Sequence, residues 1–478
     1  MRARKLFLIT AACLASAAFA YLGTGLHPIW WALWLAPIPV LAIAPRLHWS
    51  MAFVLGAIVW LIGEMNQWNY VRHAIELPPS ITVLYFITPA VIFGLGVLFV
   101  RGMLRRGSLF FASLGLPVFW VTYEYVSATK SPHSTWGNLA YTQMDCLPVI
   151  QIAAITGIWG ITFIVFLFAG VVATLLNGAG KAWHRRLLAV TGGAIVLAVL
   201  LFGKWRLQSN PSGNVVDVTL IAKDVPMNVY LGSEDQALQL LHEYADEIRR
   251  TTPAGTQVIV LPEKIGRISE AALPEVDTLF SSAAVVAHSA IVVGILRKTP
   301  SCAFNSSRLY SADGKLNANY DKQHLIPGVE PEKPGDKRVN VDEASGRWGL
   351  EICKDMDFPG LSRSYGADGA DLLLVPAWDF DIDRWLHARM AVLRAVENGF
   401  ALARSARNGL LTLSDNRGRI LAETVTQRDR FVAITGKVPV AREETFYTRT
   451  GDWFAWICIA LFVSLLAFQL LGRAKTHA

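Results

Sequence analysis

The sequence predicts two structural classes in one chain: a multi-span α-helical membrane domain of about eight helices, and a layered α/β domain placed before the last of these helices. Of its 478 residues, 53% are hydrophobic and 17% are charged, whereas soluble globular proteins average about 45–50% and about 25%. Short β-branched runs begin only near residue 214. This composition excludes disordered, collagen-like and coiled-coil proteins.

Eight apolar runs predict the membrane domain. The hydrocarbon core of a bilayer is about 30 Å thick and is crossed by about 20 apolar residues in a helix. Unsatisfied backbone groups are so costly in lipid that such runs have few alternatives to helix. The expected spans cover residues 6–23, 28–44, 51–70, 81–100, 108–126, 149–176, 187–203 and 453–472.

The positions of the basic residues explain much of the net charge of +7. If the N-terminus is cytoplasmic, most Lys and Arg of the short connecting segments lie on the cytoplasmic side, in agreement with the positive-inside rule. We therefore expect both termini in the cytoplasm, residues 204–451 on the outer side, and no nucleic-acid partner. The residues that set this orientation are Arg2, Arg4, Lys5, Arg46, Arg101, Arg105, Arg106, Lys181, Arg185, Arg186, Arg473 and Lys475.

The cysteines indicate neither a disulfide framework nor a metal site. They are five in number and widely scattered, without a CxxC pair or a Cys/His cluster of zinc spacing. The segment after residue 214 also contains no GxGxxG or GxxxxGK loop. We expect no metal and no other cofactor.

The segment after residue 214 alternates strand-like and helical stretches, which predicts a layered α/β domain. The strand-like runs are 215–221, 258–261, 290–295 and 372–375, and the helical ones are 234–250, 269–287 and 384–399. We expect residues 1–206 to form a transmembrane domain of seven helices and residues 207–444 the α/β domain. Residues 445–478 then supply a re-entry segment, the last span and a cytoplasmic tail.

Three reactive side chains follow predicted strands, where layered α/β folds place their chemistry. Glu263 ends the run from Val258, Lys322 follows a hairpin-like stretch, and Cys353 ends the run from Trp348. Singly, they are typical of a rim carboxylate, a surface lysine and a small buried hydrophobe. Together they supply a base, an oxyanion-stabilising cation and a nucleophile for acyl transfer.

These residues stand in segments that resemble the Glu-Lys-Cys triad segments of the nitrilase, or carbon-nitrogen hydrolase, superfamily. The segments are Leu261-Pro262-Glu263, 320–327 (YDKQHLIP) and 349–353 (GLEIC), followed by Ala377-Trp378, 387–391, 394–398, 404–409 and 415–420. Their combination with membrane spans resembles the apolipoprotein N-acyltransferase family, as do residues 136–143 (WGNLAYTQ) and 445–453 (TFYTRTGDW).

The resemblance implies an αββα sandwich and a ping-pong reaction. Cys353 would take an acyl chain from a phospholipid, with Glu263 as base and Lys322 on the oxyanion. The thioester would then acylate the α-amine of a diacylglyceryl-cysteine on a lipoprotein. Glu330 matches the second glutamate of the family, and Trp378 is a further supporting residue. The implied location is the bacterial inner membrane, with the α/β domain on the periplasmic side.

The sequence departs from the family beside the nucleophile. Lys354 and Asp355 follow Cys353, where the family has an aromatic residue and Glu. Asp355 keeps a carboxylate on a shorter arm, and Lys354 is a candidate to lower the thiol pKa. Three interpretations therefore stay open: lipoprotein N-acylation, an amidase or acyltransferase acting on another amine, and an inactive scaffold module.

Overall fold

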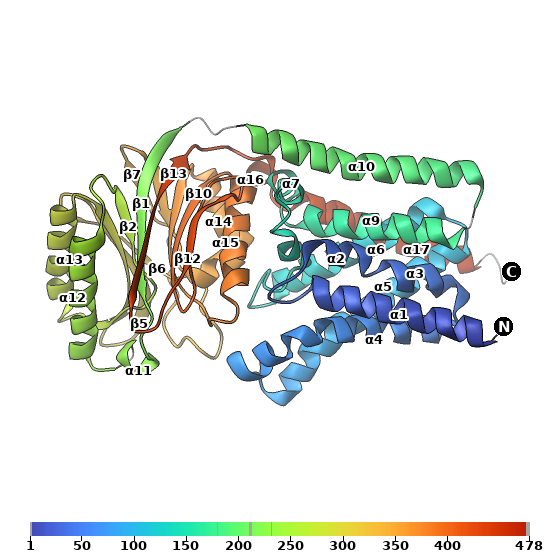
Figure 1. Ribbon diagram of the computed structural model, residues 1–478, viewed down its shortest axis with the longest axis horizontal. Coiled ribbons are helices and arrows are strands. Elements are labelled where there is room, and N and C mark those ends of the chain that lie inside the picture. The colour runs from blue at the N-terminus through green and yellow to red at the C-terminus, as the bar shows by residue number, and fades with distance from the viewer. Residues whose placement is uncertain (1, 179, 210–212, 231, 475–478) are drawn as a thin grey trace. The chain divides into compact units, whose positions relative to one another are not determined.

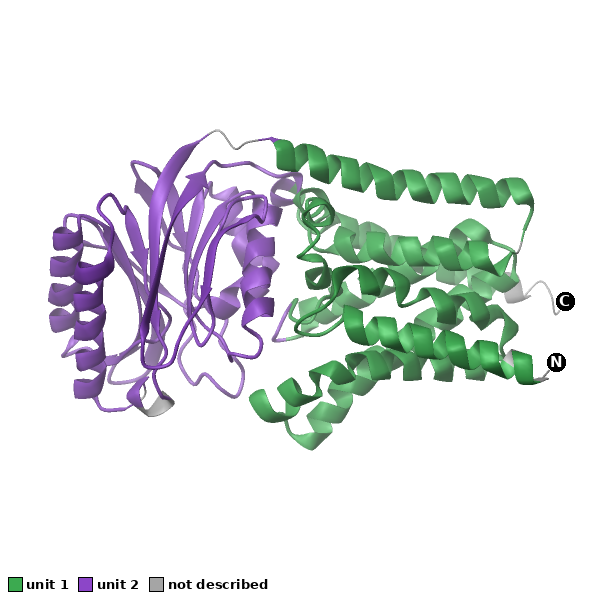
Figure 2. Ribbon diagram, viewed as in Figure 1, with its two compact units in different colours: residues 1–131, 135–208, 450–478 green, residues 132–134, 209–449 purple. Residues whose placement is uncertain are grey.

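The computed structural model describes residues 2–178, 180–209, 213–230 and 232–474. The chain forms two compact units (Figure 2). The helical unit comprises Met1–Ser131, Thr135–Gln208 and Thr450–Ala478, and the sandwich unit comprises Pro132–Ser134 and Ser209–Arg449.

Seven helices of the helical unit, among the residues described, are long and apolar enough to cross a membrane (Figure 1). Each overlaps one of the expected apolar runs, so the prediction of a multi-span membrane protein is confirmed. Their bounds are α1 (Arg2–Gly23), α4 (Trp49–Glu64), α5 (Pro79–Arg105), α6 (Leu109–Lys130), α9 (Trp159–Asn177), α10 (Ala182–Gln208) and α17 (Trp453–Ala474). The run expected at 149–176 is a continuous helix only from Trp159 onward, after the short helices α7 (Leu147–Ile150) and α8 (Ala153–Thr156).

The expected span at 28–44 is not a continuous helix. It folds as two six-residue helices, α2 (Trp30–Leu35) and α3 (Ile38–Ile43). Pro37 and Pro39 lack the N–H groups that would bond one turn back, so the helix is interrupted at Ala36 and Pro37, and Pro39 lies in the first turn of α3. At 1.5 Å per residue, neither piece alone reaches across the hydrocarbon core. Together, α2 and α3 lead the chain back from the end of α1 to the start of α4, which adds an eighth passage to the seven long helices (Figure 1).

Short elements fill the rest of the helical unit. The turn η4 (Leu139–Gln143) is buried. The Gln143 side chain joins it to α2, because its Oε1 accepts a hydrogen bond from Trp34 Nε1 at 2.7 Å and its Nε2 donates to the Trp30 carbonyl at 3.0 Å. Glu124, inside α6, accepts the backbone N–H of Leu139 at 2.8 Å. The remaining short elements are η1 (Ala44–Arg46), η2 (Met65–Gln67), η3 (Tyr70–Ala74), α7 (Leu147–Ile150) and α8 (Ala153–Thr156).

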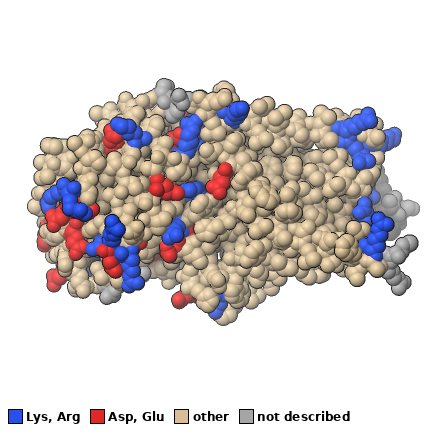
Figure 3. Space-filling view, in the orientation of Figure 1, with Lys and Arg blue, Asp and Glu red and all other residues tan. Residues whose placement is uncertain are grey.

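Lys and Arg side chains gather at one end of the helical unit, the end near which Figure 1 marks both termini (Figure 3). The expected cytoplasmic basic residues lie at the N-terminal end of α1, in η1, at or just after the C-terminal end of α5, and at or just before the N-terminal end of α10. Antiparallel succession of the helices therefore brings them to the same end.

Two β-sheets pack face to face in the sandwich unit. The first has the order β13-β1-β2-β4-β5-β6, with β3 beside β4, and the second has the order β12-β11-β10-β9-β8-β7. Parallel pairing joins β1 to β2 and β2 to β4, and also β8 to β9 and β9 to β10. Side chains that follow these strands therefore meet at common edges.

The strands of the sandwich have the following bounds: β1 (Asn214–Lys223), β2 (Val258–Val260), β3 (Arg267–Ser269), β4 (Ala290–Lys298), β5 (Ala303–Tyr310), β6 (Leu316–Asp321), β7 (Asn340–Glu343), β8 (Gly346–Leu350), β9 (Leu372–Trp378), β10 (Ala401–Arg407), β11 (Leu410–Ser414), β12 (Ile420–Val425) and β13 (Phe431–Val440).

Helices cover the outer faces of the two sheets and complete an αββα sandwich, as predicted. A core with Val260 and Leu374 fills the space between the sheets. A second core, with Leu241 and Phe280, joins the first sheet to α12 and α13. The second sheet contacts α15. The helices are α11 (Met227–Tyr230), α12 (Glu234–Thr251), α13 (Leu273–Ala287), α14 (Pro359–Ala367), α15 (Arg384–Asn398) and α16 (Phe446–Thr450), with the short turn η5 (Cys353–Asp357).

Candidate active site

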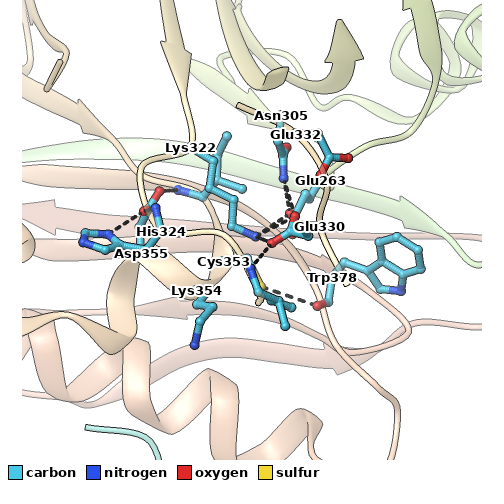
Figure 4. A network of polar contacts seen from close by, with 12 residues as sticks. Glu263, Asn305, Lys322, His324, Glu330, Glu332, Cys353, Lys354, Asp355 and Trp378 are labelled. Atoms are coloured by element: carbon cyan, nitrogen blue, oxygen red, sulfur yellow. Dashed lines mark hydrogen bonds and ion pairs between the residues drawn. The ribbon is translucent and has the colours of Figure 1, made fainter. Parts of the chain in front are cut away.

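Cys353 stands on a sharp turn just beyond β8. Its φ is +46°, in the left-handed region that non-glycine residues rarely adopt. The hydrogen bond from Glu351 N to the Leu374 carbonyl keeps the preceding residues beside β9. Cys353 Sγ lies 3.4 Å from the backbone carbonyl oxygen of Trp378, the last residue of β9 (Figure 4). The strained turn thus holds the sulfur at the carboxyl ends of two parallel strands, where nucleophiles commonly stand.

Lys322 and Glu263, which follow two strands of the first sheet, form a buried ion pair. Glu263 follows β2, and its N–H donates to the Ala377 carbonyl of β9, a contact between the two sheets. Lys322 follows β6 and is 1% exposed. Its Nζ lies 2.9 Å from Glu263 Oε1 and 2.9 Å from Glu330 Oε2. One ammonium therefore joins two carboxylates (Figure 4).

The two oxygens of Glu263 have different surroundings. Oε1 accepts hydrogen bonds from Lys322 Nζ and from Asn305 Nδ2, the latter at 2.5 Å. Oε2 is buried and has no hydrogen-bond partner among the described residues. The carboxylate is thus fixed by one oxygen, and the other is left available to accept a proton.

A second lysine extends the cluster beyond the predicted residues. Lys264 Nζ lies 2.6 Å from Glu330 Oε1 and 3.0 Å from Glu332 Oε1. Glu330 Oε2 also accepts the backbone N–H of Ile326 at 2.8 Å. Burial raises the pKa of Glu330, but Lys322 and Lys264 outweigh it and lower this pKa to about 2. Glu330 is therefore ionised at neutral pH.

Electrostatics in the cluster favour a neutral thiol and a charged lysine. Burial raises the pKa of Cys353 well above its usual value, and the Glu263 carboxylate raises it further, while Lys322 and Arg404 act to lower it. Burial acts to lower the pKa of Lys322, but the carboxylates of Glu263 and Glu330 outweigh burial and raise it. The resting thiol consequently needs a base to become a nucleophile.

The carboxylate of Asp355 holds the segment that contains Lys322. Its Oδ2 accepts the Tyr320 hydroxyl at 2.6 Å, and its Oδ1 accepts the His324 N–H at 2.8 Å and contacts His324 Nδ1 at 3.0 Å. Asp355 is fully buried. It bonds the chain on both sides of Lys322, at Tyr320 and at His324.

Lys354 does not take the place that the sequence suggested. Its ammonium is directed away from the sulfur (Figure 4) and lies 3.1 Å from Asp357 Oδ2. The cations that lower the thiol pKa are Lys322 and Arg404. The expectation that Lys354 activates the thiol is therefore not supported by the geometry, because a strained turn separates the two neighbouring side chains.

A second buried network lies behind Trp378. Arg404 binds Asp379 through two hydrogen bonds, at 2.5 and 3.0 Å. His387 Nε2 lies 3.0 Å from Asp383 Oδ2. Burial acts to lower the pKa of His387, but Asp383 outweighs it and raises this pKa to about 9. The network anchors the loop that directly follows Trp378, the last residue of β9.

Comparison with known proteins matches both parts of the chain to one family. Residues 224–435 match the carbon-nitrogen hydrolase family model, and residues 11–171 match that of the apolipoprotein N-acyltransferase N-terminal domain. The chain is 27% identical to an apolipoprotein N-acyltransferase of Geobacter metallireducens, over 95% of this chain and 93% of that protein. The chain is also 25% identical to an apolipoprotein N-acyltransferase of Vibrio vulnificus, over 94% of this chain and 97% of that protein. The chain belongs to the apolipoprotein N-acyltransferase family.

Among solved structures, Saccharomyces cerevisiae Nit3, a member of branch 10 of the nitrilase superfamily, is 24% identical with a TM-score of 0.40. It matches 46% of this chain and 90% of that chain. As a member of the apolipoprotein N-acyltransferase family, the chain is an acyltransferase within the carbon-nitrogen hydrolase superfamily and a multi-pass membrane protein.

In this member of the apolipoprotein N-acyltransferase family, one buried site contains four of the predicted residues: Glu263, Lys322, Glu330 and Cys353. Trp378 contacts this site through its carbonyl oxygen. Sequence reasoning missed Asn305 and Lys264. Lys264 directly follows Glu263, and Asn305 is polar within a strand; those were the available signals. Among the described residues, no group of three or more His, Cys, Asp or Glu side chains is arranged to hold a metal ion.

Proposed function

We propose that this chain transfers an acyl chain from a membrane phospholipid to the α-amine of the N-terminal diacylglyceryl-cysteine of lipoproteins, through a thioester on Cys353. The observation that supports this most directly is the Glu263 carboxylate, bound through Oε1 and open at Oε2. Such a base, beside a buried neutral thiol, suits an acyl transfer that begins and ends with the protonated sulfur.

In the first half-reaction, Glu263 Oε2 takes the thiol proton as Cys353 Sγ attacks the ester carbonyl carbon of the phospholipid. The carbonyl oxygen becomes an oxyanion, which the Lys322 ammonium and the backbone N–H of Lys354 stabilise. Collapse of this intermediate breaks the C–O bond. The lysophospholipid alkoxide leaves with the proton that Glu263 held, and the acyl group stays on sulfur.

In the second half-reaction, the lipoprotein α-amine attacks the thioester carbon and gives a proton to Glu263. The C–S bond breaks, the amide forms, and the sulfur takes its proton back. Glu330 keeps Lys322 in place through both halves, because its carboxylate is itself held by Lys264 and by the Ile326 N–H. Burial of the cluster excludes the water that would hydrolyse the thioester.

The altered residues after the nucleophile do not require another acceptor. Asp355 is engaged with the segment around Lys322, and Lys354 is engaged with Asp357. Both side chains thus serve the local fold, and neither is left to recognise an amine. Lipoprotein N-acylation is therefore preferred over an amidase of this fold.

We further propose that the protein lies in the bacterial inner membrane with the sandwich unit on the periplasmic side and both termini in the cytoplasm. The gathering of Lys and Arg at the end of the helical unit near both termini supports this orientation (Figure 3). Lipoprotein N-termini and a phospholipid leaflet are both available on that side.

The test is mass spectrometry of a diacylated model lipopeptide incubated with the purified full chain and phosphatidylethanolamine. We expect the peptide to gain one acyl chain, and the enzyme without peptide to gain an acyl adduct on Cys353. The Cys353→Ala variant should give neither product. Cys302→Ala, which removes a half-buried thiol elsewhere in the sandwich unit, is the matched control and should give both. An unmodified peptide beside an acylated enzyme would contradict the proposed acceptor.

A further inference from the structure

A second arginine near the site, Arg407, has no function in the chemistry described above. It is the last residue of β10, and the parallel register of β9 and β10 places it opposite Trp378. Its side chain is completely buried. Its Nε, Nη1 and Nη2 all lack a hydrogen-bond partner among the described residues.

Two aromatic rings enclose the guanidinium group of Arg407. Its Cζ lies 3.2 Å from the ring centroid of Tyr230 and 3.3 Å from that of Trp378. The Tyr230 ring is fixed in turn, because its hydroxyl donates to the Lys223 carbonyl at 2.9 Å and accepts the Val225 N–H at 3.2 Å. The Tyr230 and Trp378 ring centroids lie 5.9 Å apart, so the guanidinium is flanked by two cation–π contacts.

This arrangement is costly unless a ligand completes it. Burying a charged group without hydrogen bonds is strongly unfavourable. Other buried arginines of the sandwich unit have carboxylate partners: Arg404 binds Asp379, and Arg394 lies 2.8 Å from Glu397. Burial lowers the pKa of Arg407 and outweighs the opposing effects of Tyr230 and Glu263.

The geometry limits what such a ligand can be. Because the two rings flank the guanidinium, a ligand approaches it most readily along its edge, where the N–H groups form a fork. A fork of this kind matches two oxygens of one phosphate or carboxylate. The aromatic enclosure thus selects an oxyanion and fixes the direction from which it binds.

The position of Arg407 relates this anion site to the acyl donor. Arg407 stacks on Trp378, whose carbonyl oxygen contacts Cys353 Sγ, and it interacts electrostatically with Glu263. In a glycerophospholipid only the glycerol backbone separates the reactive ester from the phosphate. A phosphate site beside Trp378 is therefore within reach of a donor whose ester lies at the sulfur.

We propose that Arg407, held between Tyr230 and Trp378, binds the phosphate of the phospholipid acyl donor and so selects phosphate-containing lipids. The inference rests on the proposed function, in which a phospholipid supplies the acyl chain. Arg407 then acts on the donor and not on the thiol, so its effect depends on which acyl ester is offered.

The test compares the rates at which two donors in detergent micelles acylate Cys353. Each rate is measured from the intact-protein mass of the full chain in single-turnover mixtures. One donor is phosphatidylethanolamine, and the other is p-nitrophenyl palmitate, an activated ester without phosphate. With Arg407→Gln we expect the rate from phosphatidylethanolamine to fall roughly tenfold or more, since a charge-assisted bidentate contact is lost. The rate from p-nitrophenyl palmitate should stay unchanged.

Two further variants sharpen the comparison. Arg407→Lys keeps the charge and loses the fork, so its rate from phosphatidylethanolamine should be intermediate. Arg249→Gln, which removes a positive charge from the outer helix α12, should leave both rates unchanged. Unaltered acylation of Arg407→Gln by p-nitrophenyl palmitate also shows that the variant is folded.

An equal fall with both donors would overturn the proposal, because Arg407 would then act on the thiol or on the fold. Equal rates of Arg407→Gln and the unaltered chain with phosphatidylethanolamine would overturn it as well. Failure of the proposed function gives a different result: the unaltered chain would take no acyl group from phosphatidylethanolamine while p-nitrophenyl palmitate still acylated it.

Discussion

Lys322 Nζ lies 2.9 Å from Glu263 Oε1, and this contact leaves Glu263 Oε2 without a hydrogen bond among the described residues. The pair thereby separates two tasks within one carboxylate: one oxygen orients the ammonium, and the other is open to a proton. Both residues are almost fully buried, so little water competes for either oxygen.

Removal of the Lys322 ammonium should impair acylation more than folding. We expect Lys322→Met to slow acylation of Cys353 roughly 10²- to 10³-fold, the usual cost of losing an oxyanion donor. Because Lys322 acts to lower the thiol pKa, alkylation of Cys353 by iodoacetamide should also shift to higher pH. Lys315→Met, an exposed lysine on the hairpin before Lys322, is the control. An unshifted alkylation profile would count against the contact.

The Lys264 and Glu332 pair offers a test of how Glu330 is held. Lys264→Met should destabilise the protein by about 3 kcal/mol, since it leaves Glu332 buried and unpaired. The double variant Lys264→Met/Glu332→Gln should recover part of this loss, because the uncompensated charge is then removed. Thermal unfolding of the four proteins of this cycle measures the coupling. Additive losses would show that the two side chains act independently.

Asp355 should affect the rate of acylation and leave donor affinity unchanged. Asp355→Asn replaces one acceptor oxygen by an NH₂ group that faces N–H and O–H donors, at a cost of about 1–3 kcal/mol. The segment around Lys322 is then misplaced, so we expect kcat to fall while KM stays the same. Asp355→Glu restores the acceptor and should recover part of kcat. The exposed Asp313→Asn is the control, and a change confined to KM would contradict the assignment.

The ion pair of His387 and Asp383 should make stability depend on pH. The pKa of His387 rises from 6.5 to about 9 in the folded protein. Because the pKa is higher in the folded state, protonation of His387 stabilises the folded protein fully below pH 6.5. This stabilisation is lost as the pH rises through about 9. Below pH 6.5, we expect the free energy of unfolding of the unaltered protein to exceed that of His387→Gln by about 2–3 kcal/mol. This difference should disappear as the pH rises through about 9.

Thermal unfolding over this pH interval checks the effect of His387. His242→Gln, which removes an exposed histidine of α12, should show no such dependence. A constant difference between the unaltered protein and His387→Gln across the interval would mean that the ring is neutral in the fold.

The proposed orientation can be checked with reporter fusions. Alkaline phosphatase, which is active only outside the cytoplasm, should be active when fused after residue 208 at the end of α10. A fusion at the C-terminus should be inactive there, whereas green fluorescent protein should fluoresce at that position. The reverse pattern would place the sandwich unit in the cytoplasm and would remove its access to lipoprotein N-termini.

Much of the architecture follows from local sequence patterns. Long apolar runs must be helical in lipid, whatever they pack against, so seven of the eight expected spans could be read directly. The eighth, at 28–44, differs because two prolines interrupt its hydrogen bonds. In the sandwich unit, β-branched runs predicted the strands. The positions of Glu263, Lys322 and Cys353 directly after predicted strands made them candidate site residues.

The sequence by itself determined which side chains end the strands, because strand length and side-chain chemistry are local properties. Only the tertiary structure decided which further residues join them. Antiparallel pairing of β5 with β6 places Asn305 beside Lys322, where its side chain binds Glu263. The parallel register of β9 and β10 places Arg407 opposite Trp378. Register is fixed by the packing of whole sheets around a shared core, and no local run of residues encodes it.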